Sequence, residues 1–187
     1  LLNEEHTKVN RILGTLCHLG YIEKTPTNKY KAGPAIHIMA SLTLTSSKLL
    51  HSAIEPIKEL LETKQTVALG VLWKQKVSYI FHGNHKLPFE KCIGSHNLFP
   101  EEKSSIGTII RVFNKESKLT VADKKIIHEG YCYASATEND ISLAVTIGKP
   151  KVIAGLALAG NKKNFNHEEN LKKLLTAAEK INAVLYQ

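Results

Sequence analysis

The sequence predicts an α+β protein with a small helix-and-hairpin head, a connecting helix and a larger body of antiparallel strands flanked by helices. Three observations predict this class. Apolar residues from Val9 to Leu19 recur three and four positions apart, as on one face of a helix, and two short strand-like runs follow them. Two further pairs of β-rich runs lie in the rest of the chain. A long run with helical spacing closes the sequence.

The composition is that of a folded protein. The 187 residues are 43% apolar and include 11 glycines, which excludes disorder throughout and allows one sizeable core. No apolar run approaches the roughly 20 residues of a membrane span, and the N-terminus lacks the layout of a secretory signal, so we expect a cytoplasmic protein with no membrane partner. The three cysteines are widely spaced and odd in number, which argues against a disulfide framework.

The net charge suits a polyanionic partner but does not identify one. The formal charge is +8 and the sequence pI is near 9.3. Residues 1–33, however, carry five basic and three acidic residues, so most of the positive charge lies in the remainder of the chain. The arrangement of residues in this first segment is therefore more informative than the total charge.

Residues 7–33 have the pattern of a recognition helix followed by a two-stranded wing. This arrangement is typical of a motif that binds DNA and recognises its sequence. After Gly20, which suits a left-handed helix end, residues 21–24 and 29–32 can pair across the turn at 25–28. Short polar side chains would read base edges and cations would meet phosphate. The alternative is an ordinary solvated helix face. The predicted DNA-binding residues are His6, Thr7, Lys8, Asn10, Arg11, Lys24, Asn28, Lys29 and Lys31.

The recognition helix lies very near the start of the sequence, which opens on Leu1 and not on methionine. A helix-turn-helix needs earlier helices against which its recognition helix packs. We therefore expect the true N-terminus to be missing and residues 1–33 to be a partial winged helix-turn-helix. Residues 34–48, which begin with Pro34 at a first-turn position, are predicted as a linker helix, and residues 49–187 as the body.

The body begins with a predicted helix over 48–63, in which Pro56 implies a kink or a restart. The apolar period then changes, and residues 67–72 and 77–82 predict a hairpin about the turn at 73–76. Residues 83–103 are predicted to be irregular. The elements predicted after them are a helix over 104–113, a capped helix over 120–130, a hairpin of 141–147 with 152–159, and a final helix from Asn166 to Leu185 that covers one sheet face.

Three segments of the sequence resemble the IclR family of bacterial transcription regulators. VNRILGTLCHLGYIEKTPTNKYKAGPAI is similar to the family's recognition helix, wing and linker start. PEEKSSIGTIIRVF looks like its Pro-Leu-His-Ala-Ser-x-x-Gly-Lys segment, and EGYCYASATENDISLAVTIGKPKVIAGLALAG resembles its acidic loop and closing hairpin. Each segment alone is weak, but three in this order are specific. Glu101 and Glu102 depart from the family pattern, as does Thr108, which leaves fewer hydrogen bonds for an effector.

The resemblance implies a partial winged helix-turn-helix, a linker helix and a GAF/profilin-like antiparallel-sheet effector-binding domain. It also implies a homodimer or tetramer whose sequence-specific binding to operator DNA is controlled by a small-molecule effector, such as a carboxylate or aromatic metabolite. The alternative is a small-molecule-sensing domain that acts through protein partners without specific DNA binding. We find no nucleophile–base set, phosphate loop or paired-carboxylate arrangement, so we expect neither an enzyme nor a cofactor.

The sensing pocket is expected between the second hairpin of the body and the helix that begins at Ser104. The free N–H groups at the start of that helix can receive an anionic or carbonyl ligand. Ser104, Ser105 and Ile106 are the main candidates. The resemblance adds Phe89, Glu138, Ser142 and Ala157. Each of these residues can also be explained by a structural role alone, the serines as helix caps and Ala157 as part of the strand core.

Four residues offer a superficial zinc set. His82, His85, Cys92 and His96 form the pattern H-x2-H-x6-C-x3-H in and after a predicted strand. Closed zinc sites usually show tighter paired spacings, and solvated loop histidines explain the pattern more simply. We therefore predict no metal site.

Overall fold

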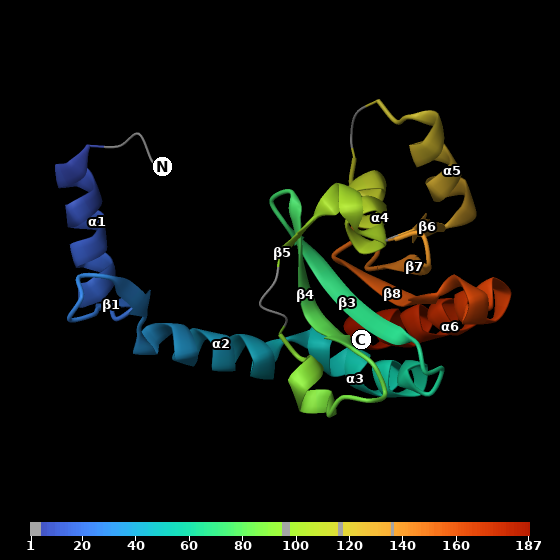
Figure 1. Cartoon of the computed structure of the whole chain (residues 1–187), viewed down its shortest axis with the longest axis horizontal. Coiled ribbons are helices and arrows are strands. Elements are labelled where there is room, and N and C mark those ends of the chain that lie inside the picture. Colours follow the sequence, from blue (N-terminus) through green and yellow to red (C-terminus); the bar gives the residue numbers. More distant parts are fainter. Residues whose placement is uncertain (1–4, 95–97, 116–117, 136) are drawn as a thin grey trace. The chain divides into compact units, whose positions relative to one another are not determined.

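The computed structural model describes residues 5–94, 98–115, 118–135 and 137–187. The chain divides after Ser47 into two compact units. The first unit contains α1 (His6–His18), β1 (Ile22–Lys24), β2 (Tyr30–Ala32) and α2 (Pro34–Ser46) (Figure 1). Within the described residues, no helix has the length and apolar character needed to cross a membrane.

Helix α1 ends in a tight turn that starts the hairpin. Gly20 has a φ of 73°, and its N–H donates to the Cys17 carbonyl (3.0 Å). The Tyr21 N–H reaches back to the Leu16 carbonyl (2.9 Å). This pair of bonds around a left-handed glycine is the Schellman arrangement, which satisfies carbonyls that a helix end would otherwise leave unpaired. The chain therefore leaves α1 directly into β1.

The wing is a short antiparallel hairpin, with Ile22 opposite Ala32 at its base. Thr25 holds its turn, because the Thr25 N–H donates to the Lys29 carbonyl (2.7 Å) and the Thr25 hydroxyl accepts from the Lys29 N–H (3.1 Å). Asn28 has a φ of 58°, a left-handed conformation that asparagine tolerates better than most residues. The turn residues thus fix the hairpin locally.

Gly33 closes the base of the wing against the end of α1. Its N–H donates to the Tyr21 carbonyl (2.8 Å), and the Ala35 N–H donates to the Gly20 carbonyl (3.1 Å). A Cβ placed on Gly33 would lie 2.2 Å from the Gly20 oxygen. Only glycine fits this contact, which joins α1, the hairpin and the start of α2.

The second unit is an antiparallel six-stranded sheet of order β5-β4-β3-β8-β7-β6, flanked by helices. This confirms the predicted α+β class. Its elements are α3 (Lys48–Leu61), β3 (Thr66–Trp73), β4 (Lys76–Gly83), η1 (Phe89–Cys92), β5 (Leu98–Pro100), η2 (Glu101–Lys103), α4 (Ser105–Phe113), α5 (Val121–Glu129), β6 (Tyr131–Ser135), β7 (Asp140–Ile147), β8 (Ala154–Asn161), η3 (Lys162–Asn164) and α6 (His167–Leu185).

The sheet has a different core on each face. Helices α3 and α6 cover one face, where Leu69 and Leu156 of the strands pack with Ile181 of α6 (Figure 1). Helix α4 covers the other face, where Ile109 packs with Ala157 of β8. Because successive strand residues point to opposite faces, neighbours such as Leu156 and Ala157 belong to different cores.

A β-bulge at Ile80 changes the direction of the side chains along β4. Leu69 of β3 pairs with Phe81, but the next residue, Gly70, pairs with Tyr79, so Ile80 is the extra residue. Phe81 accordingly lies in the core under α3 and α6, whereas Tyr79 packs on the α4 side. The bulge therefore brings the Tyr79 hydroxyl towards α4.

Two strands differ from the sequence prediction. The segment 83–103 contains the short strand β5, and β6 follows Gly130 where no strand was predicted. Both lie at sheet edges and have three and five residues, too few for a clear alternating pattern. Helix α3 also runs through Pro56 without a restart, with that proline buried.

The contact at Gly33 yields a test of how the first unit is closed. We expect Gly33→Ala to destabilise this unit by about 1–3 kcal/mol, because the added methyl group overlaps the Gly20 carbonyl. Gly14→Ala is the matched control. A Cβ at Gly14 meets no atom within 4 Å, so alanine should stabilise α1 by up to about 1 kcal/mol. Amide hydrogen exchange of α1 measures both effects, and equal exchange rates in the two variants would contradict the proposed closure.

Candidate functional site

The first unit presents the predicted helix residues on its surface. His6, Thr7, Lys8, Asn10 and Arg11 are all exposed on α1. The Asn10 amide nitrogen lies 3.2 Å from the His6 ring nitrogen one turn earlier, which orders these two side chains on one strip of the helix. Within the described part of the chain, the Arg11 guanidinium has no ion-pair partner. The surface of α1 therefore offers both ordered polar groups and an available cation.

The wing lysines are not equivalent. Lys31 forms an ion pair with Glu23 (2.8 Å), which lies directly opposite it in the hairpin register. Lys24 and Lys29 are exposed, and among the described residues neither has an ion-pair partner. Asn28 is also exposed at the turn. The uncompensated positive charge of the wing thus lies at Lys24 and Lys29.

Ser104 positions the start of α4. Its hydroxyl oxygen accepts from the Gly107 N–H (3.3 Å), which is the N-cap role that the sequence offered as its structural reading. The Tyr79 hydroxyl oxygen lies 3.2 Å from the same Ser104 oxygen. Ser104 is only 7% exposed. The cap is therefore buried and is tied to strand β4 as well as to its own helix.

Ser105 ties α4 to β7. The Ser142 hydroxyl donates to the Ser105 hydroxyl oxygen (2.7 Å), and Ser105 is 4% exposed. Next to it, Ile106 enters a space that two strand glycines leave open. A Cβ on Gly155 would lie 2.9 Å from the Ile106 Cγ2, and a Cβ on Gly70 would lie 3.3 Å from it. The helix start is thus held close to the sheet.

These contacts gather five of the seven predicted effector residues on one face of the sheet. Ser104, Ser105 and Ile106 begin α4, while Ser142 and Ala157 come from β7 and β8. The first N–H groups of a helix have no acceptor inside it and lie at the positive end of its dipole. Donors and buried hydroxyls in this arrangement suit a ligand that carries a carbonyl or carboxylate oxygen.

The structure places the other two predicted effector residues elsewhere. Phe89 packs on the α3 and α6 side of the sheet, with its ring centroid 5.0 Å from that of Phe81. Glu138 is exposed in the turn before β7. Phe89 is therefore on the opposite face of the sheet from the start of α4.

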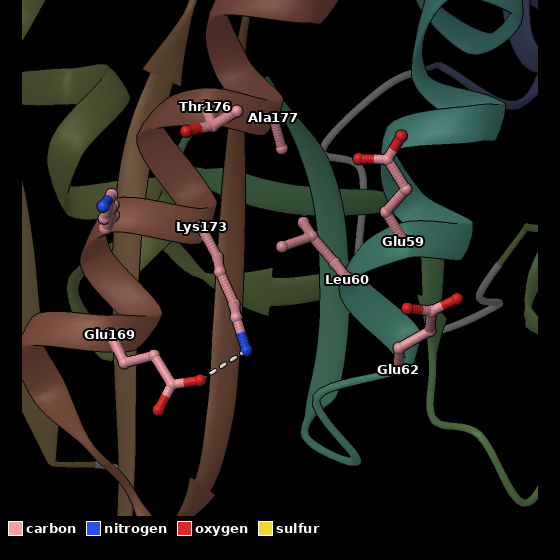
Figure 2. A pocket seen from close by; sticks show the side chains of 8 residues that line it. Glu59, Leu60, Glu62, Glu169, Lys173, Thr176 and Ala177 are labelled. Carbon is pink, nitrogen blue, oxygen red and sulfur yellow. Dashed lines mark hydrogen bonds and ion pairs between the residues drawn. The ribbon is translucent and has the colours of Figure 1, made fainter.

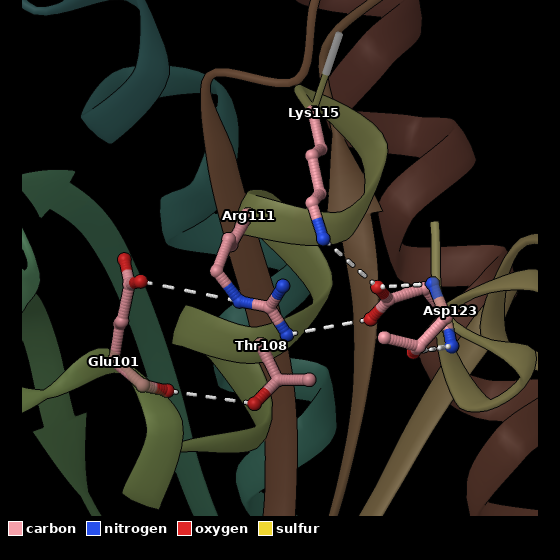
Figure 3. Close-up of polar contacts among 6 residues, drawn as sticks. Glu101, Thr108, Arg111, Lys115 and Asp123 are labelled. Atoms are coloured by element: carbon pink, nitrogen blue, oxygen red, sulfur yellow. Dashed lines mark hydrogen bonds and ion pairs between the residues drawn. The ribbon is translucent and has the colours of Figure 1, made fainter. Parts of the chain in front are cut away.

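A charged network holds the outer side of α4. Arg111 lies between Glu101 (3.9 Å) and Asp123 (3.4 Å), and Lys115 also contacts Asp123 (3.2 Å) (Figure 3). The Thr120 N–H donates to the Asp123 carboxylate (3.0 Å) in a capping box at the start of α5. That backbone hydrogen bond, aided by Lys115, lowers the pKa of Asp123 to about 2. The ionised carboxylate therefore links α5 to α4.

Sequence reasoning identified the capping box but missed Tyr79, Arg111 and Cys132. Arg111 is the single charged residue in the apolar pattern of α4, and that break in the pattern was a usable signal. Tyr79 depends on the bulge, which has no clear mark in the sequence. Cys132 is buried on β6 against the α4 core, and burial raises the pKa of its thiol to about 11, so the thiol is neutral.

The described residues of the zinc pattern do not form a metal site. Cys92 is buried beneath Gly83, and its thiol donates to the Pro88 carbonyl (3.4 Å). The His82 ring lies 5.2 Å from the Tyr79 ring, and His96 lies outside the described residues. In the part of the chain that the structure describes, no three His, Cys, Asp or Glu residues are grouped as metal ligands.

A cavity of about 590 Å³ lies on the opposite side of the sheet, between α3 and α6 (Figure 2). Glu59, Leu60 and Glu62 line one wall, and residues of α6 line the other. Lys173 forms an ion pair with Glu169 in the α6 wall, and Glu59 pairs with Lys180. The charges of this cavity are largely paired, and none of the predicted effector residues lines it.

Comparison with known proteins identifies the fold. No family model and no curated protein matches the sequence. Among solved structures, an IclR-family transcriptional regulator from Brucella abortus aligns over 96% of this chain and 80% of its own, at 17% identity and a TM-score of 0.75. The C-terminal domain of the E. coli transcriptional regulator KdgR aligns over 75% of this chain and 99% of its own, at 23% identity and a TM-score of 0.61.

A third structure carries a ligand. It is an IclR homolog from Microbacterium hydrocarbonoxydans in complex with 4-hydroxybenzoate, which aligns over 96% of this chain and 85% of its own, at 17% identity and a TM-score of 0.68. Two of the three alignments cover nearly the whole chain, and the third covers three quarters of it. The chain therefore has the fold of the IclR-type transcriptional regulators.

Proposed function

We propose that this chain is an IclR-family transcriptional regulator that binds specific DNA through α1 and the wing and responds to a small molecule bound at the start of α4. The observation that carries this proposal is the exposed polar strip of α1 held next to a wing with uncompensated lysines. A regulator needs no catalytic residues, and we propose neither an enzymatic activity nor a cofactor. We place its action in the cytoplasm, where it meets DNA.

The proposed DNA contacts follow from the chemistry of the exposed groups. An α-helix fits the major groove, where Arg11 suits the two acceptors of guanine and Asn10 the donor–acceptor pair of adenine. His6, Thr7 and Lys8 lie in the first turn of the same helix. Lys24 and Lys29 of the wing would meet phosphate, which adds affinity that is independent of sequence.

The proposed effector carries a carboxylate or an aromatic ring. The N–H groups of Ser105 and Ile106 and the hydroxyls of Ser105 and Ser142 provide donors for a carboxylate. The 4-hydroxybenzoate bound to the Microbacterium homolog, which has both chemical features, supports this class. A ligand there would compete with the bond between Ser142 and Ser105, and so would act on the contact that joins α4 to β7.

We also propose that the protein acts as a homodimer or tetramer. Palindromic operators match a two-fold protein, with one recognition helix in each half-site. Helix α2 contains no Asp, Glu, Lys or Arg, and its Ile38 and Leu42 side chains are each 62% exposed. A solvent-exposed helix of this composition is suited to contact another apolar surface, such as a second copy of α2.

The DNA proposal is tested by the wing lysines. We expect Lys29→Ala to weaken DNA binding similarly for all sequences. It should also reduce, by about one, the magnitude of the slope of the logarithm of the binding constant against the logarithm of the salt concentration. Lys31→Ala is the matched control, with a smaller effect because Lys31 is already paired with Glu23.

A second variant tests the helix. Arg11→Ala should weaken the free energy of DNA binding by about 1–3 kcal/mol and make binding less selective for sequence. Fluorescence anisotropy, with protein expressed from its own gene and DNA from upstream of that gene, measures all three. Equal binding to upstream and shuffled DNA would contradict the proposal.

The effector proposal is tested by a thermal-shift series with aromatic and aliphatic carboxylates, beginning with 4-hydroxybenzoate. A ligand at 100 times its Kd should stabilise the protein by about 2.7 kcal/mol. Ser105→Ala should reduce this ligand-induced shift, measured from the variant's own unliganded Tm. Ser52→Ala is the control, because Ser52 is equally buried but lies in α3 and donates to the Leu49 carbonyl. Equal ligand shifts in the two variants would show that the α4 site is not the ligand site.

A further inference from the structure

A second cavity, with a polar lining, lies at the end of the sheet where β3 begins and where β4 and β8 end. Its volume is about 480 Å³, within the range of small-molecule sites. The lining contains Lys64, His85 and Lys86 together with four side-chain amides, and it contains no carboxylate. This composition differs from that of the cavity between α3 and α6, whose walls carry both signs of charge.

The local turns engage the amide acceptors of this cavity and leave the donors available. The Asn84 side-chain oxygen accepts from the Lys86 N–H (3.0 Å), and the Asn161 side-chain oxygen accepts from the Lys163 N–H (3.1 Å). Among the described residues, the NH₂ groups of these two asparagines have no hydrogen-bond partner. The cavity therefore presents N–H donors to whatever occupies it.

Lys64 holds a backbone conformation that favours glycine. It follows the end of α3 with a φ of 60°, and its N–H donates to the Leu61 carbonyl (3.1 Å). A lysine is strained there, and glycine would adopt the same turn without that strain. Asn28 and Lys74 hold the same left-handed backbone in other turns, so this conformation alone indicates a turn, and the case for a binding site rests on the lining of the cavity.

No carboxylate lines the cavity, although two acidic residues lie close to its lining residues in the sequence or the sheet. In the described chain, Lys64 and Lys86 have no ion-pair partner. Glu62 lines the cavity between α3 and α6. Asp140, the first residue of β7, lies opposite Asn161 and accepts from the Thr137 hydroxyl (2.9 Å). The lining itself is therefore basic and contains no acidic side chain.

Gln65 adds an acceptor to the cavity. Its side-chain nitrogen donates to the Asn164 carbonyl (3.5 Å), which leaves its oxygen facing Gly160. A Cβ on Gly160 would lie 1.8 Å from that oxygen, so a larger residue there would displace the glutamine amide from this position. One amide oxygen among many donors suits a ligand hydroxyl.

We propose that this cavity binds a small hydroxylated anion, in which a phosphate or carboxylate group meets Lys64 and the asparagine donors and a hydroxyl meets Gln65. The proposed ligand class is therefore the sugar phosphates and sugar acids. This site is separate from the α4 site and does not depend on the proposed regulatory function.

The test uses calorimetric titration of the whole chain with glucose 6-phosphate, gluconate and glucose. We expect at least one of the two anions to bind, and neutral glucose to bind at least ten-fold more weakly. Tighter binding of glucose 6-phosphate identifies a phosphate site, and tighter binding of gluconate a carboxylate site. Absence of binding by both anions at about 10 mM, or equal binding of glucose, would overturn the proposal.

Lys64→Gly separates binding from folding. It should weaken anion binding at least ten-fold while the Tm stays the same or rises, because glycine relieves the backbone strain. Lys74→Gly is the matched control, with the same charge loss at a φ of 56° in the turn after β3. The eight residues of β3 separate the two lysines by roughly 25 Å. Equal losses in both variants, or binding abolished by Ser105→Ala but not by Lys64→Gly, would place the anion elsewhere and refute the site.

Discussion

The close packing of α4 on the sheet is the contact on which the rest of the second unit depends. Ile106 fits against Gly155 and Gly70, where any larger strand residue would push the helix away. At this separation Ser105 reaches Ser142, and Ser104 reaches the Tyr79 hydroxyl that the bulge in β4 directs to this face. The two strand glycines therefore determine whether the serines form a single polar site.

The two ends of α4 are held by different kinds of interaction. At its start, neutral hydroxyls and unpaired helix N–H groups meet the sheet in a buried environment, where each hydrogen bond matters. Further along the helix, Arg111 and Lys115 bind the ionised Asp123 and so connect α4 to α5. A ligand that displaces the Ser142 hydroxyl from Ser105 would thus act at one end of a helix whose outer side is fixed by charge.

Local signals in the sequence were sufficient for much of this arrangement. Helical spacing and Gly20 predicted α1 and its end, and the order Ser104, Ser105, Ile106 predicted a helix start with available donors. The missing parts depend on the exact register between strands, which the prediction of a hairpin does not define. The bulge that turns Tyr79, the register that sets Glu23 opposite Lys31, and the cavity at Lys64 all arise only when strands are aligned. The pattern of residues within each strand does not specify that alignment.

Thermodynamic linkage tests the proposal that a ligand site in the second unit controls DNA binding by the first. Ligand affinity is measured for the free protein and for the protein saturated with its upstream DNA. We predict that the two affinities differ, typically by about 5- to 150-fold, and that the ligand changes DNA affinity by the same factor. Identical ligand affinities in the two states would show that the proposed ligand site does not control DNA binding.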